Sequence, residues 1–120
     1  MFDEKRIRKH GTPARAVVVS MQRHSHVSSN DYQRYDYVLE VHPAGEGPFQ
    51  VEVQDTFLIV MGKPEQFDEV NVKFDPKSKE TVFDLEGDPR FDLEAMKAHT
   101  AQLRQETAQM NAAYRQQQGR

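Results

Sequence analysis

The sequence contains no cysteine, and this single absence excludes several kinds of chemistry. The chain cannot form a disulfide, use a thiolate nucleophile, or hold zinc or an iron–sulfur cluster through thiolates. A composition without cysteine is compatible with a reducing compartment, and we expect a cytoplasmic protein. No other pattern in the sequence indicates a cofactor, so none is expected.

Long hydrophobic segments are lacking as well. The longest uninterrupted apolar run covers only residues 57–61, whereas a membrane-spanning helix needs about 20 apolar residues. The first residues, MFDEKR, contain no apolar stretch of the kind found in secretory signals. The sequence therefore predicts neither a signal peptide nor insertion into a membrane.

Charge is distributed unevenly along the 120 residues. Residues 1–34 carry seven Lys or Arg and three acids, residues 35–95 carry five and fifteen, and residues 96–120 carry four and one. The net charge of −3 argues against a general nucleic-acid binder, because phosphate binding depends on clustered cations. Residues 1–10 are expected to form a solvated and frayed basic arm. Its four cations are Lys5, Arg6, Arg8 and Lys9.

Several segments alternate apolar and polar residues or are rich in β-branched residues, as strands are. We expect strands over residues 14–22, 32–42, 49–54, 70–75 and 81–86. Glycines and prolines at residues 43–48 predict a hairpin connection between the second and third strands. The apolar run at residues 57–61 is expected either to extend the third strand past a bulge or to form a short helical turn.

Short antiparallel strands that follow one another closely favour a closed sheet, because closure removes exposed edges. We therefore predict a mainly β protein: a small five-stranded antiparallel OB-like barrel over residues 11–88, followed by a long C-terminal α-helix and tail over residues 89–120. Within the second strand, Tyr35 and Tyr37 share a face with Leu39, which makes both tyrosines candidates for the core.

Three features of the barrel region occur together in a known family. They are Gly11 followed by Ala14, Ala16 and Val18, the hairpin rich in tyrosine and valine, and the stretch VNVKFDP at residues 70–76. In these features the chain resembles a family of small, mostly uncharacterised actinobacterial proteins and membrane-protein segments, of the DUF3592 or OB-like kind. The resemblance implies an antiparallel barrel without an established activity, and it brings no catalytic residues. Many members are flanked by membrane helices, which are not expected here.

Patterns for catalysis or metal binding are weak. His24 and His26 form an H-x-H pair that, in an extended segment, would point to one side as metal ligands can. Asp31 or His42 would have to complete the site, and neither has a diagnostic spacing. No phosphate-binding loop or nucleophile elbow is present. We predict a protein that is not an enzyme and has no metal site, and an enzyme or metal protein using the two histidines is the third hypothesis.

Nucleic-acid binding through the barrel is the second hypothesis. Tyr32 and Arg34 resemble the aromatic and basic surface on which OB-type barrels stack single-stranded bases. The basic arm, with Lys5, Arg6, Arg8 and Lys9, would add contacts to the phosphates. The acidic body would repel them, so we expect single-stranded RNA or DNA to be an unlikely partner.

The C-terminal segment predicts a long helix. Asp88 can cap free amides, Pro89 suits the first turn, and no helix-breaking residue follows before Gln117. Apolar residues and threonines then recur at intervals of three and four, which places them in one narrow seam. The seam consists of Leu93, Met96, Thr100, Leu103, Thr107, Met110 and Tyr114.

This helix is too long for the barrel to cover. A helix over residues 89–117 would reach roughly 43 Å at 1.5 Å per residue, whereas ordinary strands span ~17 to 20 Å. Its distal half is expected to fray, to pair with its own copy, or to lie in a groove of a larger assembly. We predict a non-catalytic adaptor or accessory subunit that binds a protein partner or forms a homo-oligomer through Leu93, Met96, Leu103, Met110 and Tyr114.

Overall fold

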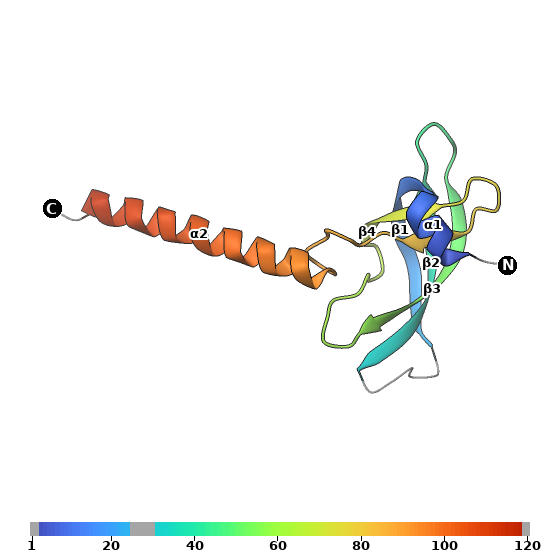
Figure 1. Ribbon diagram of the computed structural model, residues 1–120, viewed down its shortest axis with the longest axis horizontal. Helices are drawn as coiled ribbons and strands as arrows, with labels where there is room; N and C mark the ends of the chain where they lie inside the picture. Colours follow the sequence, from blue (N-terminus) through green and yellow to red (C-terminus); the bar gives the residue numbers. More distant parts are fainter. Residues whose placement is uncertain (1–2, 25–30, 119–120) are drawn as a thin grey trace. The chain divides into compact units, whose positions relative to one another are not determined.

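The computed structural model describes residues 3–24 and 31–118, which divide into two compact units, Met1–Leu85 and Glu86–Arg120. The first unit is a five-stranded antiparallel sheet that curls into a nearly closed barrel, and the second contains one long helix (Figure 1). The predicted OB-like barrel followed by a C-terminal helix is thus confirmed. The elements are α1 (Glu4–His10), β1 (Thr12–Arg23), β2 (Tyr32–His42), β3 (Phe49–Leu58), β4 (Glu69–Phe74), β5 (Thr81–Phe83) and α2 (Leu93–Gln118).

The sheet has the strand order β3-β2-β1-β4-β5, with the longest strand, β1, at its centre. Each neighbouring pair is antiparallel, so β3 and β5 at the two edges run in the same direction. The register of β1 against β2 shifts between Val18 and Ser20, and such a bulge bends a strand and increases its twist. This curvature brings the edge strands β3 and β5 into contact across the remaining gap.

The core follows the alternation of the strands. In β2, Tyr37, Leu39 and Val41 are buried, while Tyr35 is half-buried on the same face. The hydroxyl of Tyr37 donates a hydrogen bond to the carbonyl of Pro64 at 3.0 Å, so the buried phenol keeps a polar partner. The other buried apolar side chains of the first unit are Ile7, Ala16, Val18, Val53, Val70, Val72, Phe74, Val82 and Phe83.

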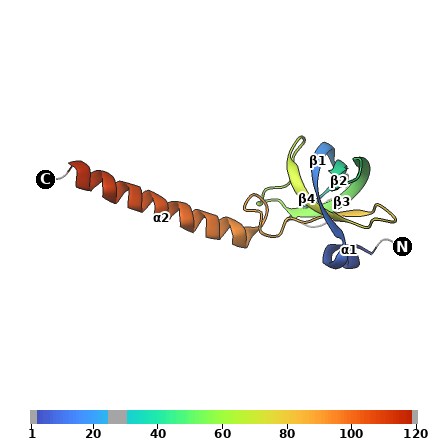
Figure 2. The same ribbon diagram turned by 90° about the horizontal axis from the view of Figure 1, so that it is seen from above.

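The N-terminal segment differs from the expected frayed arm, because residues 4–10 form helix α1 at one end of the barrel (Figure 2). Asp3 caps the helix by accepting a hydrogen bond from the backbone N–H of Arg6 at 3.0 Å. Ile7 is only 2% exposed, and α1 contacts β4 and β5. A Cβ on Gly11, where the helix ends, would lie 2.5 Å from the carbonyl oxygen of Ile7, so the junction requires glycine.

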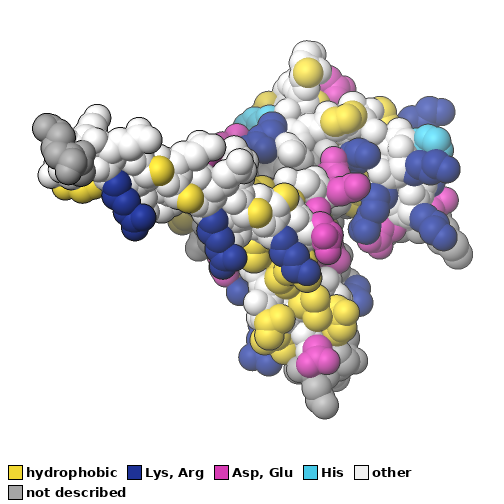
Figure 3. All heavy atoms as spheres, turned by 60° about the vertical axis from the view of Figure 1, so that its left-hand side comes forward, with side chains coloured by type: hydrophobic (Ala, Val, Ile, Leu, Met, Phe, Trp, Pro, Cys, Tyr) yellow, Lys and Arg dark blue, Asp and Glu magenta, His cyan; other side chains and the backbone are white. Residues whose placement is uncertain are grey.

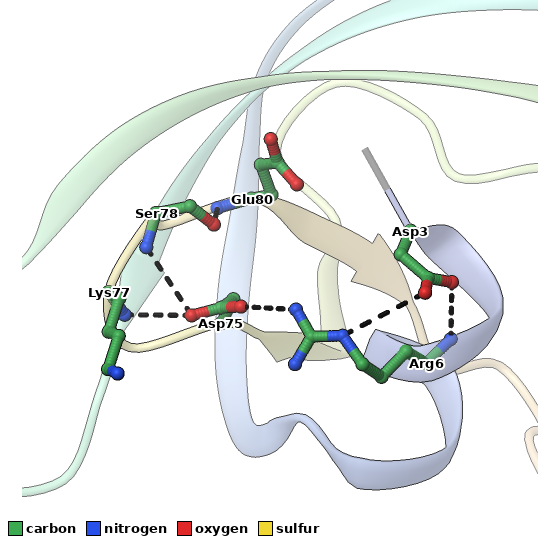
Figure 4. A network of polar contacts seen from close by, with 6 residues as sticks. All are labelled: Asp3, Arg6, Asp75, Lys77, Ser78 and Glu80. Atoms are coloured by element: carbon green, nitrogen blue, oxygen red, sulfur yellow. Dashed lines mark hydrogen bonds and ion pairs between the residues drawn. The ribbon is translucent and has the colours of Figure 1, made fainter. Parts of the chain in front are cut away.

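Polar contacts hold α1 against the β4–β5 turn (Figure 4). The Arg6 guanidinium donates to Asp75 Oδ2 at 2.8 Å, and Asp75 Oδ1 accepts from the backbone N–H of Lys77 at 2.8 Å. These hydrogen bonds, that of Arg6 first, lower the pKa of the Asp75 carboxyl below its ordinary value. On the other side, Lys73 Nζ donates to the carbonyl of Arg8 at 2.9 Å. The partners are far apart in sequence, which is why the sequence pattern did not reveal them.

The strand ends also differ in detail from those predicted. β3 continues to Leu58 in regular register with β2, without the expected bulge, and the chain then turns at residues 59–60. The apolar run at 57–61 is therefore part strand and part turn. β5 is shorter than predicted and ends at Phe83.

Helix α2 begins at Leu93, four residues after the predicted start at Pro89. The cap is Asp92, not Asp88: Asp92 Oδ1 accepts from the backbone N–H groups of Glu94 at 3.0 Å and Ala95 at 3.4 Å. Asp92 Oδ2 also accepts from the N–H of Gly87 at 2.7 Å. These backbone hydrogen bonds lower the pKa of the Asp92 carboxyl. Asp88 instead closes the preceding turn, accepting from the N–H of Arg90 at 3.0 Å.

The helix has 26 residues, and its length is about 39 Å at 1.5 Å per residue. Alanine, glutamine, glutamate and arginine make up much of it, and all of them favour helix. None of the helices within residues 3–24 and 31–118 is both long enough and apolar enough to cross a membrane.

Candidate functional site

The apolar seam of α2 is an exposed apolar surface that runs along a single element. None of the residues Leu93–Gln118 is buried. Leu93 is 45% exposed, Leu103 48%, Met110 70% and Tyr114 62%, and Met96 is half-buried. The predicted partner-binding residues thus lie along one helix face, at the spacing that helix-in-groove recognition uses.

One flank of this seam carries only positive charge within α2. Lys97, Arg104 and Arg115 are spaced seven and eleven residues apart, which brings them to the same side of a helix. Figure 3 shows a row of Lys and Arg side chains along α2. The acid Glu106 lies on the opposite flank, where its Oε1 accepts from Gln102 Nε2 at 3.1 Å. A partner groove that takes the seam would therefore meet cations along one edge.

The residues predicted for nucleic-acid binding are only partly brought together. Tyr32 and Arg34 are both exposed on one face of β2, and Arg34 donates to Gln54 Oε1 at 2.6 Å. That face continues with Asp36 and Glu40, which would repel phosphate.

The cations of α1, which were predicted to add phosphate contacts, are partly paired with acids of the same protein. Arg6 pairs with Asp75, Arg8 pairs with Glu4, and Lys5 and Lys9 are exposed.

The histidine pair is only partly described. His24 Nδ1 lies 3.2 Å from Asp36 Oδ2, and His26 lies outside the described residues. Within residues 3–24 and 31–118, no three His, Asp or Glu side chains are grouped so that they could hold a metal ion.

The sequence interpretation missed a cleft between the two edge strands, which we call the β3–β5 cleft. It has a volume of about 370 Å³. Its lining residues are Glu4, Arg34, Val51, Glu52, Val53, Gln54, Asp55, Glu80, Thr81, Val82 and Phe83. The alternation of β3 did hold a signal, since Asp55 follows Val51 and Val53 at intervals of two and therefore shares their inward face.

Asp55 is a half-buried carboxylate on the inward face of this cleft. Its Oδ1 accepts a hydrogen bond from the N–H of Thr56 at 2.8 Å. Burial nevertheless raises the pKa of the Asp55 carboxyl, and the charge of Glu4 adds to the rise, while Arg8 and Arg34 act in the opposite sense. An inward carboxylate of this kind is stabilised by any cation that reaches it.

A second exposed apolar surface lies where β2 begins and β3 ends. Tyr32 and Leu58 are paired across the two strands and are 43% and 36% exposed. Ile59 and Val60 follow at 57% and 91%. Figure 3 shows hydrophobic side chains gathered on the lower part of the first unit in that view. From the sequence, the run at residues 57–61 predicts only secondary structure, and its exposure could not be read from it.

No family model, curated protein or solved structure matches this chain. The features that bear on its function are therefore the α2 seam, the β3–β5 cleft and their charges.

Proposed function

We propose that this protein is a non-catalytic adaptor or accessory subunit that binds another protein chain, a second copy of itself or a different subunit, through the seam of α2. The observation that carries the proposal is that a helix of 26 residues buries none of them while it presents Leu103, Met110 and Tyr114 on one face.

Burial of this seam would supply the stability that the helix lacks alone. Isolated helices are marginal in water even with favourable residues, and most helical stability in proteins comes from packing an apolar face. Complete burial of a leucine or methionine side chain contributes about 1.5 to 3 kcal/mol. Leu103 and Met110 are 48% and 70% exposed, so burial of each in a complex would contribute part of this free energy.

The pattern also limits the kind of complex. Leu93, Thr100, Thr107 and Tyr114 occupy one set of core positions and Met96, Leu103 and Met110 the other, as in a two-helix seam of three heptads. Threonine at two core positions weakens a self-paired zipper. A groove of a different subunit, with acids beside Lys97 and Arg104, would suit the seam better than the same helix repeated.

Position-specific crosslinking in the native host tests this proposal. A photoreactive residue is placed at position 103 or 110 in the seam, or at position 105. Gln105 lies on the opposite side of the helix, so it is the matched control. We expect one defined crosslinked species from positions 103 and 110 and none from position 105, with the bound chain identified by mass spectrometry. Equal crosslinking from all three positions, or none from any, would contradict the proposal.

A charge substitution gives an independent measurement on the purified chain. Leu103→Lys should abolish the complex, whereas Gln105→Lys, which adds the same charge on the other side, should leave its mass unchanged. Sedimentation equilibrium of the chain alone decides whether the partner is a second copy, since self-association makes the mass depend on concentration. A complex that survives Leu103→Lys and Met110→Lys together would rule out the seam as the binding surface.

A further inference from the structure

The two edges of the sheet remain open. β3 is ten residues long and pairs with β2, and β5 is three residues long and pairs with β4. The described residues show no ladder between β3 and β5. β5 can face at most three of the ten residues of β3, so much of the outer edge of β3 keeps unpaired N–H and C=O groups. An edge of this kind is a template for a further strand.

The β3–β5 cleft lies along this open edge and has an apolar interior. Val51 and Val53 contribute from β3, and Val82 and Phe83 from β5. The inner edge of β3 is fully paired here, because residues 49–58 are in unbroken register with β2. The cleft therefore combines free backbone groups with a surface that would accept alternate side chains of an extended chain.

The charges around the cleft have mostly one sign. Four carboxylates line it, from Glu4, Glu52, Asp55 and Glu80, and one guanidinium, that of Arg34. Glu4 pairs with Arg8, so the excess negative charge of the cleft comes from the other three. The Arg34 guanidinium donates a hydrogen bond to Gln54 Oε1. An anionic ligand would be repelled, whereas lysine or arginine side chains would be attracted.

We propose that the β3–β5 cleft binds an extended, basic segment of a partner protein, which adds a strand to the open edge of β3. Its backbone pairs with β3, its apolar side chains contact Val51 and Val53 on the inward face, and its lysine or arginine side chains on the other face are attracted by Glu52 and Glu80. The β3–β5 cleft and the α2 seam are separate binding surfaces, so the protein binds two partners or contacts one partner at two places.

The open edge favours an extended segment over a helix. A helix satisfies its own backbone groups and would leave those of β3 unpaired, whereas an added strand satisfies both chains. The charge favours a basic protein segment over single-stranded nucleic acid, whose phosphates would meet the four carboxylates.

A defined peptide tests this proposal on the full chain. The probe is a ten-residue peptide with blocked ends that alternates lysine and valine. Two control peptides replace every lysine by glutamate or methylate every second backbone nitrogen. We expect the lysine peptide alone to shift the NMR amide signals of residues 51–55 and 81–83 and to slow amide exchange along β3. Binding should weaken at least about tenfold when salt rises from 50 to 500 mM.

Charge reversal locates the binding. Glu52→Lys combined with Glu80→Lys should weaken binding of the lysine peptide at least about tenfold. Glu86→Lys, an exposed reversal outside the cleft lining, should leave the affinity within about twofold. If the double variant does not fold, Glu52→Lys alone serves, since Glu52 is exposed on β3.

Three results would overturn the proposal: equal binding of the glutamate peptide, equal binding of the N-methylated peptide, or signal shifts confined to α2. Tighter binding of an oligothymidine than of the lysine peptide, with shifts at residues 51–55, would assign the cleft to nucleic acid instead. None of these results bears on the α2 seam, which is tested by positions 103 and 110.

Discussion

The barrel and the C-terminal helix use the same kind of apolar pattern with opposite outcomes. In the first unit, alternate residues of β2 and β4 are buried, and Val70 and Val72 have no exposed surface. In α2, a pattern of equal regularity leaves Leu103 and Met110 at 48% and 70% exposed. The comparison teaches that periodicity identifies the apolar face of an element, whereas the length and neighbours of the element decide whether the chain itself covers that face.

The largest difference in the free energy of unfolding is expected between substitutions of a buried apolar residue, Ile7, and an exposed one, Leu103. Ile7→Ala should lower the free energy of unfolding by about 2 to 5 kcal/mol, because it removes a side chain that is 2% exposed and leaves a cavity under α1. Leu103→Ala should lower it by less than about 1 kcal/mol in the uncomplexed chain. Urea unfolding of both variants measures the difference, and equal losses would show that α2 belongs to the core.

A gain in stability is expected at Phe67, an exposed residue with strained backbone. Its φ is 74° and its side chain is 76% exposed, so it contributes little packing while it occupies the left-handed region. Phe67→Gly should stabilise the barrel by about 1 kcal/mol, because glycine adopts this conformation without strain. Phe67→Ala keeps the strain and is the matched control. A gain from both variants would assign the effect to the side chain and not to the backbone.

At pH 7, removing the charge of Asp55 and removing that of Asp75 should change the melting temperature in opposite directions. Burial raises the pKa of Asp55, so its charged form disfavours the fold at neutral pH, and this penalty disappears as the pH falls through the raised value. Asp55→Asn should therefore raise the melting temperature at pH 7 and lose that advantage in acid. Asp75, whose pKa is lowered, contributes stability at pH 7 that is lost in acid, so Asp75→Asn should lower the melting temperature at pH 7. Melting curves between pH 3 and 8 that show the same sign for both would contradict this assignment.

The smallest change in melting temperature is expected from removing helix α2. A chain that ends at Leu85 should melt within about 4 °C of the full chain, because no residue of α2 is buried and a change of 1 kcal/mol moves a small domain by about 4 to 8 °C. Differential scanning calorimetry of both chains measures this. A large loss would mean that α2 supports the barrel, and the contrast between the two units would fail.

The sequence predicted the strands well because alternation is a local signal. β2 has the predicted bounds, and the inward face of Tyr37 and Leu39 follows from a period of two. The predicted start of α2 was wrong because Asp88 and Asp92 are both able to cap a helix. In the structure Asp92 caps it, while Asp88 accepts a hydrogen bond from Arg90 in the preceding turn.

The N-terminal helix and the cleft could not be predicted, because they depend on residues far apart in the chain. Ile7 is a single apolar residue among charged ones, and its burial against the sheet, like the contact of Arg6 with Asp75, 69 positions away, depends on the folded barrel. The carboxylates of the β3–β5 cleft come from α1, β3 and the start of β5, so only closure of the sheet collects them. For α2, the sequence predicted the seam, but it holds no information about what covers it.

The bulge in β1 has a consequence for the loop that follows β3. At the bulge, the Val18 carbonyl accepts a hydrogen bond from the N–H of Phe67 at 2.7 Å, and the Val19 carbonyl accepts one from Gln66 Nε2 at 3.1 Å. The bulged segment of the central strand thus binds the connection between β3 and β4, residues 59–68, at Gln66 and Phe67. Deleting Val19 would remove the bulge and the hydrogen bond to Gln66, while Ser20 and Met21 would keep their partners Val38 and Tyr37 and the faces they point to.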